Sequence, residues 1–166
     1  RIPWLLLLSI SSTFTSIIIN HYDTALTAFG LAAFMPMLMD TGGNAGSQAS
    51  VTIIRGLSLG EIEMNDILRI IWKEFRVSLL CGITMAIATF GKIMLVDRPD
   101  MMIAVVVSLT LICTIMTAKR VGCTLPMLAK RIGFDPAVMA SPFITTIVDA
   151  LSLMLYFWIA TALLAA

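Results

Sequence analysis

Residues 2–20 read IPWLLLLSISSTFTSIIIN and carry no charged side chain. A helix needs about 20 apolar residues to cross roughly 30 Å of bilayer hydrocarbon, so this stretch predicts a transmembrane helix. The same criterion predicts four more spans, at residues 24–54, 77–96, 101–118 and 136–166. We therefore expect an all-α polytopic membrane protein with five transmembrane helices per subunit.

The composition of the whole chain supports this class. Hydrophobic residues make up 59% and charged residues 13% of the 166 residues, against about 45–50% and about 25% in soluble domains. The mean hydropathy of +0.98 leaves too little polar surface to cover a water-soluble globule. A net charge of +1 argues against nucleic-acid binding, and three cysteines without a CxxC motif argue against a disulfide or zinc scaffold. Without an HExxH motif or paired catalytic acids, we do not expect an enzyme.

An amphipathic segment separates the second and third spans. Ser58-Leu59-Gly60-Glu61 has the form of a helix capping box. The apolar residues after it recur at the spacing of one helical face: Met64, Ile67, Leu68, Ile71, Trp72 and Phe75. This pattern predicts an interfacial helix over about residues 59–75, lying on the membrane surface. A short soluble helix docked on a missing domain is the alternative.

The basic residues predict the orientation in the cell membrane. With five spans, the N-terminal side holds nine: Arg1, Arg55, Arg69, Lys73, Arg76, Lys119, Arg120, Lys130 and Arg131. The opposite side holds Lys92 and Arg98. Basic residues concentrate on the cytoplasmic side, so we expect a cytoplasmic N-terminus and an extracytoplasmic C-terminus. Membrane lipid is an expected partner, since Lys119-Arg120 and Lys130-Arg131 are suited to anchoring helix ends to anionic headgroups.

Two spans carry one acid each near their middle. Residues 24–54 contain Asp40 and residues 136–166 contain Asp149. An ionised carboxylate at the bilayer centre costs at least about 2.5–3.5 kcal/mol. Neither span has a basic residue beside its acid that would neutralise it. The two carboxylates therefore need water or a cation, which indicates a cation path.

The second span has an unusual sequence around its acid, FMPMLMDTGGNAGSQ at residues 34–48. Pro36 removes a helical hydrogen bond and Gly42-Gly43 permits unusual backbone angles, so we expect the helix to break near residues 36–46. Irregular backbone at membrane depth is tolerated where it lines an aqueous cavity. Asn44, Ser47 and Gln48 would add oxygen ligands there. Alternatively, Gly42 and Gly46 only allow two helices to pack closely.

The last span has a polar stripe. Ser141, Thr145, Asp149 and Ser152 fall on one helical face, and Tyr156 continues it. Asp135-Pro136 is an N-cap followed by a helix-starting proline. The stripe is either part of the ion path or an inter-helix hydrogen-bond seam.

Carboxylate, amide and hydroxyl oxygens suit a hard cation such as Mg²⁺ or Mn²⁺, between which the composition does not choose. Mg²⁺ keeps several waters and is usually held through one or two carboxylates. A two-fold homodimer would bring two Asp149 side chains to one axis. We therefore expect a homodimer with a central pore.

Two separated motifs resemble those of the MgtE magnesium channel/transporter family: residues 34–49 with 55–61, and residues 134–149. The resemblance covers the whole chain as that family's five-helix membrane domain. It implies a homodimeric Mg²⁺ pore lined by the second and fifth spans, with Asp149, Asn44 and Asp135 as metal-binding residues. The pore-lining residues are then Asp40, Gly42, Gly43, Gly46, Ser47, Gln48, Ser141, Thr145 and Ser152.

The resemblance leaves some points open. The family pattern does not require an acid at the position of Asp40. Asp40 would then be an extra ion contact or a cap for the second half of its span. The resemblance also implies an N-terminal cytosolic regulatory region with paired CBS modules, which we expect to be naturally absent here or to have been removed. Two other functions stay possible: an ion-coupled secondary transporter of a small solute or of another divalent cation such as Mn²⁺, and a membrane scaffold without transport activity.

Overall fold

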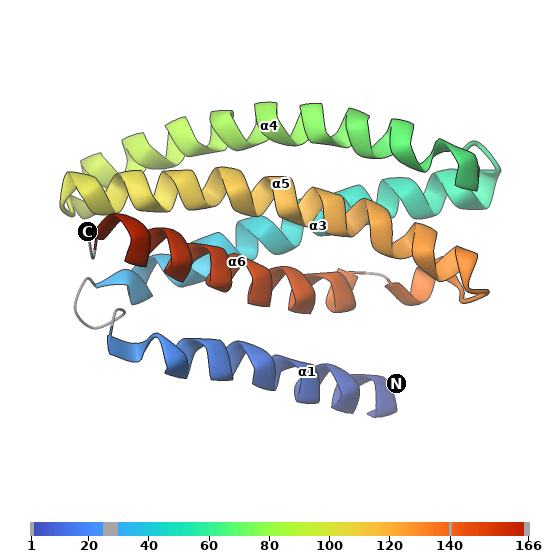
Figure 1. Ribbon diagram of the computed structural model, residues 1–166, viewed down its shortest axis with the longest axis horizontal. Coiled ribbons are helices and arrows are strands. Elements are labelled where there is room, and N and C mark those ends of the chain that lie inside the picture. Colours follow the sequence, from blue (N-terminus) through green and yellow to red (C-terminus); the bar gives the residue numbers. More distant parts are fainter. Residues whose placement is uncertain (1, 25–29, 140, 165–166) are drawn as a thin grey trace.

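The computed structural model of the chain describes residues 2–24, 30–139 and 141–164, and every regular element in them is helical. The long helices lie side by side along one axis (Figure 1). They are α1 (Ile2–His21), α3 (Met35–Leu59), α4 (Ile67–Lys92), α5 (Met101–Arg131) and α6 (Ser141–Leu164). The short helical turns are η1 (Leu31–Phe34), η2 (Met64–Asp66), η3 (Ile93–Asp97) and η4 (Pro136–Met139).

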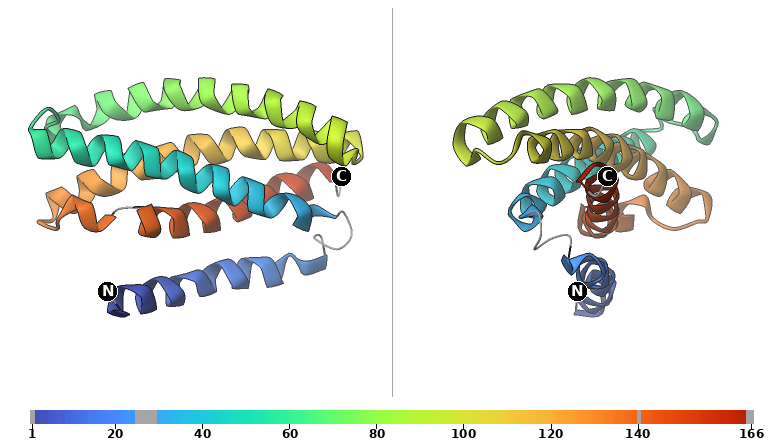
Figure 2. Two further views of the ribbon diagram at one scale, coloured as in Figure 1. Left: turned by 180° about the vertical axis from the view of Figure 1, so that it is seen from behind. Right: turned by 60° about the vertical axis from the view of Figure 1, so that its left-hand side comes forward.

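Helix α5 is the centre of the bundle. It contacts α3, α4 and α6, and α3 also packs on α6. Helix α1 packs on α6, on the side away from α4 (Figures 1 and 2). Helix α1 begins at one end of the bundle and α6 finishes at the other, so the two ends of the described chain lie on opposite sides.

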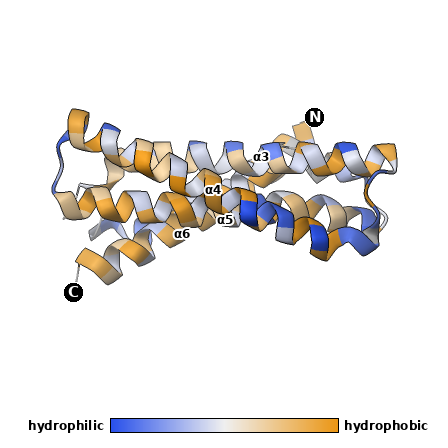
Figure 3. Cartoon of the chain, turned by 90° about the horizontal axis from the view of Figure 1, so that it is seen from above, coloured by the Kyte–Doolittle hydropathy of each residue, from blue (hydrophilic) through white to orange (hydrophobic). Residues whose placement is uncertain are grey.

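The described residues confirm the all-α prediction, and several of their helices have the length and composition to cross a membrane. Within the described residues, three segments are long and apolar enough to cross a membrane, Ile67–Asp97, Met101–Arg131 and Pro142–Leu164, and α1 contributes the shorter apolar stretch Leu5–His21. Hydrophilic residues concentrate in the half of the bundle away from the C-terminus (Figure 3). The count of five spans and the homodimer stay predictions.

The break expected near residues 36–46 lies earlier in the chain. Gly30 has a φ of 64°, which is open to glycine, and η1 follows it. Pro36 lies in the first turn of α3, where no intrahelical donor is needed, so it starts the helix instead of interrupting it. Helix α3 then runs unbroken through Gly42-Gly43 to Leu59.

The amphipathic segment also differs from its prediction over residues 59–75. Helix α3 ends at Leu59 with Gly60 in the left-handed region, at a φ of 71°. The capping box is Glu63 with Asp66, and the expected partner Ser58 instead donates to the Ile54 carbonyl at 2.9 Å. The residues after η2 continue without interruption into the third span as α4. No separate surface helix forms within residues 30–139, because nothing interrupts the backbone hydrogen bonds of α4 between Ile67 and Lys92.

Helix α5 extends well beyond residue 118, where its span was expected to end. It continues through Pro126 to Arg131. The proline costs one backbone hydrogen bond, and burial of Cys123 and Met127 against Ala49 and Ile53 of α3 offsets that cost. At the same end, Lys130 Nζ donates to the Leu57 carbonyl at 3.3 Å and ties α5 to the end of α3.

Candidate functional site

Helix α3 has two faces of different chemistry. One is a glycine face formed by Gly42, Gly43 and Gly46, all buried against α5 and α6. A methyl group at Gly42 would lie 2.7 Å from Thr114 Cγ2 of α5 and 2.9 Å from Ser152 Oγ of α6. These separations are shorter than van der Waals contact, so the three helices meet at a distance that only glycine allows.

The same close approach continues one turn further along α3. A Cβ at Gly46 would lie 3.0 Å from Ile144 Cγ2 and 3.2 Å from the Ala118 carbonyl oxygen. A Cβ at Gly122 of α5 would overlap the carbonyl oxygen of Gly46. The glycines therefore work as packing residues, which is the alternative that the sequence left open for Gly42 and Gly46.

The other face of α3 is polar and open. Asp40, Asn44 and Gln48 are exposed and follow each other at four-residue spacing, which places them in one row. They line a hollow of about 420 Å³ together with Thr41 and Ala45 of α3. The remaining wall consists of Cys81 and Met85 from α4, and Ile115 and Lys119 from α5.

Asp149 of α6 lies next to Gly43, at the edge of the glycine face of α3. Its side chain is half-buried, and its Oδ1 atom would be 3.8 Å from a Cβ at Gly43. Ser47, which is also half-buried, lies one turn after Gly43. Asp149 of α6 thus lies beside the helix that carries Asp40.

The polar stripe of α6 divides into two parts. Thr145 and Asp149 remain partly exposed, and the Thr145 hydroxyl donates to the Pro142 carbonyl at 2.9 Å. Ser152 is buried and donates to the Val148 carbonyl at 2.6 Å. Tyr156 is buried and donates to the Leu31 carbonyl at 3.0 Å. In this second part, Tyr156 bonds to another element, whereas Ser152 bonds within α6.

Two other expected site residues lie where α6 begins. Asp135 is exposed and its Oδ1 atom accepts a hydrogen bond of 2.9 Å from the Ala137 N–H, as expected for a cap of η4. Ser141 is the first residue of α6, and its side chain lies outside the described part of the structure.

Sequence reasoning missed the α4 and α5 residues of the hollow. The sequence predicts that Lys119 lies at the end of a helix, but it lies within α5 and pairs with Glu74 of α4 at 3.8 Å. The close contact of α5 with α3 had a signal in the sequence, because Ala118 and Gly122 are small residues four positions apart.

The end of α3 contains a sequence that resembles a catalytic motif but does not have the structure of that motif. Residues 56–60, GLSLG, match the spacing of a GxSxG nucleophile turn. In that motif the serine sits on a sharp turn between a strand and a helix. Here Ser58 lies within the last turn of α3 and donates to its own helix. The motif therefore has no catalytic geometry in this chain.

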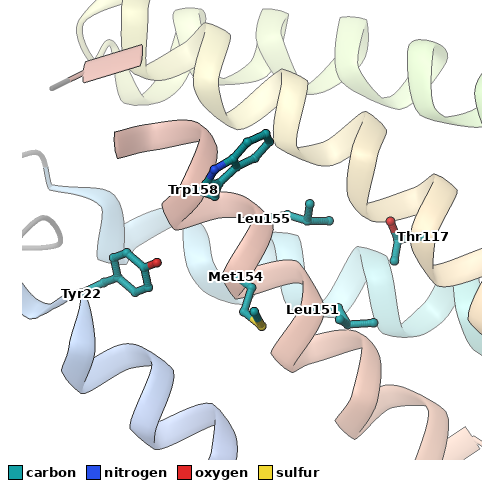
Figure 4. Close-up of a pocket in the computed structure, with 6 residues that line it drawn as sticks. All are labelled: Tyr22, Thr117, Leu151, Met154, Leu155 and Trp158. Carbon is teal, nitrogen blue, oxygen red and sulfur yellow. The ribbon is translucent and has the colours of Figure 1, made fainter. Parts of the chain in front are cut away.

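A second hollow, of about 380 Å³, lies between the end of α1 and helices α5 and α6 (Figure 4). Tyr22 and Thr117 contribute hydroxyl groups, and the other lining residues are apolar: Leu151, Met154, Leu155 and Trp158. This lining lacks the carboxylate and amide oxygens of the first hollow. The candidate cation site is therefore the α3 polar face with Asp149.

The comparisons with known proteins agree with this chemistry. The model of the MgtE family, described as divalent cation transporters, matches residues 35–159. Magnesium transporters MgtE from Thermus thermophilus and Bacillus subtilis are 36% and 35% identical over 100% and 98% of the chain. A third, from Enterococcus faecalis, is 32% identical over 97% of it. The chain spans 36–37% of the length of these relatives. From these matches we conclude that the chain belongs to the MgtE family of divalent cation transporters.

Proposed function

We propose that this chain forms a dimeric path for Mg²⁺ along the polar face of α3, with Asp149 binding the hydrated ion. The observation that carries the proposal is the exposed row of Asp40, Asn44 and Gln48 on a helix packed among membrane-spanning helices. Carboxylate and amide groups facing lipid would each cost several kcal/mol, so this row needs water, an ion or a second protein surface beside it.

A second copy of the chain would complete the path. The polar face of α3 is open on one side in the single chain. Two copies related by a two-fold axis, with α3 and α6 facing each other, would bury both polar rows and place two Asp149 carboxylates near one axis. The polar groups would then line water between the copies.

The ligand chemistry favours hydrated Mg²⁺. Within the described residues, no three His, Cys, Asp or Glu side chains cluster to form a complete metal cage. A pair of carboxylates with nearby amide oxygens suits a cation that keeps its own water shell, which Mg²⁺ does. The relatives named as magnesium transporters support the same cation. Asp135, at the end where α6 begins, would attract cations at the mouth of the path.

The test is Mg²⁺ influx into vesicles that contain the reconstituted chain and a Mg²⁺-sensitive dye. We expect influx without an imposed proton or sodium gradient. Asp149→Ala should reduce it to background, and Asp149→Asn should mainly reduce the preference for divalent over monovalent cations. The matched control is Asp97→Ala, because Asp97 is exposed in the turn between α4 and α5.

Each result separates the proposal from its alternatives. Full influx in Asp149→Ala would show that the ion is bound elsewhere. Influx that requires a proton or sodium gradient would favour an ion-coupled transporter. Faster Mn²⁺ than Mg²⁺ influx would change the assigned cargo while keeping the path. A chain that is folded and dimeric but inactive would support a scaffold.

A further inference from the structure

A third hollow, of about 310 Å³, lies between the first turns of α4 and one residue of α5. It is lined by Leu68, Ile71, Trp72, Phe75 and Arg120. The hollow combines an apolar surface with one positively charged side chain, Arg120. It is separate from the proposed Mg²⁺ path. We propose that this hollow binds a phospholipid with a negatively charged headgroup.

The apolar part of the hollow suits the glycerol region and upper acyl chain of a lipid. Leu68 is 78% exposed and Trp72 is 62% exposed. The Trp72 ring stacks on the Phe75 ring, with 5.7 Å between centroids and 14° between planes. These two stacked rings form the aromatic floor of the hollow. Tryptophan is enriched at the level of lipid headgroups, where an apolar body and a polar N–H are both accommodated.

The charged part of the hollow suits a phosphate. The Arg120 guanidinium lies 5.0 Å from the centroid of the Phe75 ring, and this cation–π contact orients it beside the hollow. Arg120 is exposed, so donors of its guanidinium can reach a phosphate from the headgroup layer. Arg76 is exposed four residues after Trp72, on the same face of α4. The neighbouring acid Glu74 forms its ion pair with Lys119 and not with Arg120.

The position of the hollow along the bundle matches the depth of lipid headgroups. The uncharged stretch of α4, residues 77–91, begins directly after Arg76. The aromatic floor therefore lies at the boundary of the hydrocarbon, with two arginines at headgroup level. A zwitterionic lipid has no net charge to offer them, whereas an anionic lipid gains on the order of fivefold in affinity per basic residue near the membrane surface.

Tryptophan quenching by brominated lipids tests the proposal directly. We would reconstitute the full chain with Trp4→Phe and Trp158→Phe, which leaves Trp72 as the only indole among its three tryptophans. Quenching by brominated phosphatidylglycerol is compared with quenching by brominated phosphatidylcholine. We expect the anionic lipid to quench Trp72 more strongly by about fivefold or more at equal mole fraction. A second single-tryptophan chain that keeps Trp158, which is 68% exposed on α6, is the matched control and should show no preference.

The charge variants identify the source of the preference. Arg120→Gln in the Trp72-only chain should remove most of the preference, and Arg55→Gln, which changes an exposed arginine of α3, should retain it. Equal quenching of Trp72 by both lipids would overturn the proposal, as would the same preference at Trp158. Trp72 quenched by neither lipid would also overturn it and would favour a cytosolic protein segment on this face. The proposal does not depend on the ion path, so Mg²⁺ influx is a separate readout.

Discussion

Gly43 of α3 faces Asp149 of α6 so closely that a Cβ at Gly43 would lie 3.8 Å from Asp149 Oδ1. The same Cβ would lie 2.9 Å from Thr145 Cγ2, one turn earlier on α6. The missing side chain thus sets the separation between the backbone of α3 and the carboxylate of α6. In the proposed path, this separation determines where Asp149 holds the hydrated ion.

Gly43→Ala should therefore reduce both stability and Mg²⁺ influx. The added methyl group forces α6 to shift, and overpacking of this kind costs about 1–3 kcal/mol. Combining it with Thr145→Ser removes the methyl group that clashes, so the double variant should recover most of the influx. Recovery is measured in the vesicle assay. An equal loss in the single and double variants would show that this contact does not position Asp149.

Gly122→Ala should destabilise the bundle more strongly than Gly43→Ala. Its new Cβ would overlap the backbone carbonyl oxygen of Gly46, and backbone cannot rotate away as a side chain can. The control is Gly91→Ala in α4, where nothing lies within 4 Å of the added methyl group. That change should leave stability unchanged or raise it by up to about 1 kcal/mol, because alanine is the better helix former. Thermal unfolding in detergent micelles compares the two, and similar midpoints would contradict the close crossing of α3 and α5.

Asp40→Asn should reduce Mg²⁺ influx by about fivefold without unfolding the chain. Asp40 is exposed in the polar hollow, so the isosteric change removes one negative charge near the path, worth on the order of 1 kcal/mol. Influx is measured at low and high salt, because added salt should shrink the difference. Asp100→Asn changes an exposed acid before α5 and should have no effect. If both variants behave alike, Asp40 has no part in conduction.

The Glu74–Lys119 pair should stabilise the contact between α4 and α5. Their side chains are 16% and 12% exposed, so removing either charge leaves the other poorly solvated. We expect Glu74→Gln and Lys119→Met each to lower stability, and the double variant to lose less than the sum. The coupling energy should be about 0.5–3 kcal/mol in a double-mutant cycle on unfolding in mixed micelles. Strict additivity would mean that the two charges are independent.

The proposed orientation can be tested by cysteine labelling. In a chain whose native cysteines are replaced, Asp100→Cys should react with a membrane-impermeant maleimide added outside intact cells. Arg131→Cys should react only after the cells are opened, because the basic residues predict that the end of α5 is cytoplasmic. Labelling of Arg131→Cys alone in intact cells would show the opposite orientation. Labelling of both positions in intact cells would contradict the five-span topology.

Sequence alone determined the class of protein and its family. Uncharged stretches of about 20 residues specify membrane-spanning helices whatever the rest of the fold, because every backbone polar group must be hydrogen-bonded within the bilayer. The isolated acids Asp40 and Asp149 indicated a cation for a similar reason, since an uncompensated charge at that depth is costly. Two separated motifs also pointed correctly to the MgtE family.

The tertiary structure decided how those residues are distributed. Local rules predicted a broken helix around Gly42-Gly43, but α3 stays continuous because the glycines allow contacts with Thr114 and Ser152 that offset their poor helix propensity. Pro126 is tolerated within α5 for the same reason, since its neighbours are buried against α3. Which helices meet decides that α3 has a buried glycine face and an open polar face. It also decides that Ser152 and Tyr156 are buried. Helical spacing identifies which residues share a face, whereas only the packing of other helices decides what that face contacts.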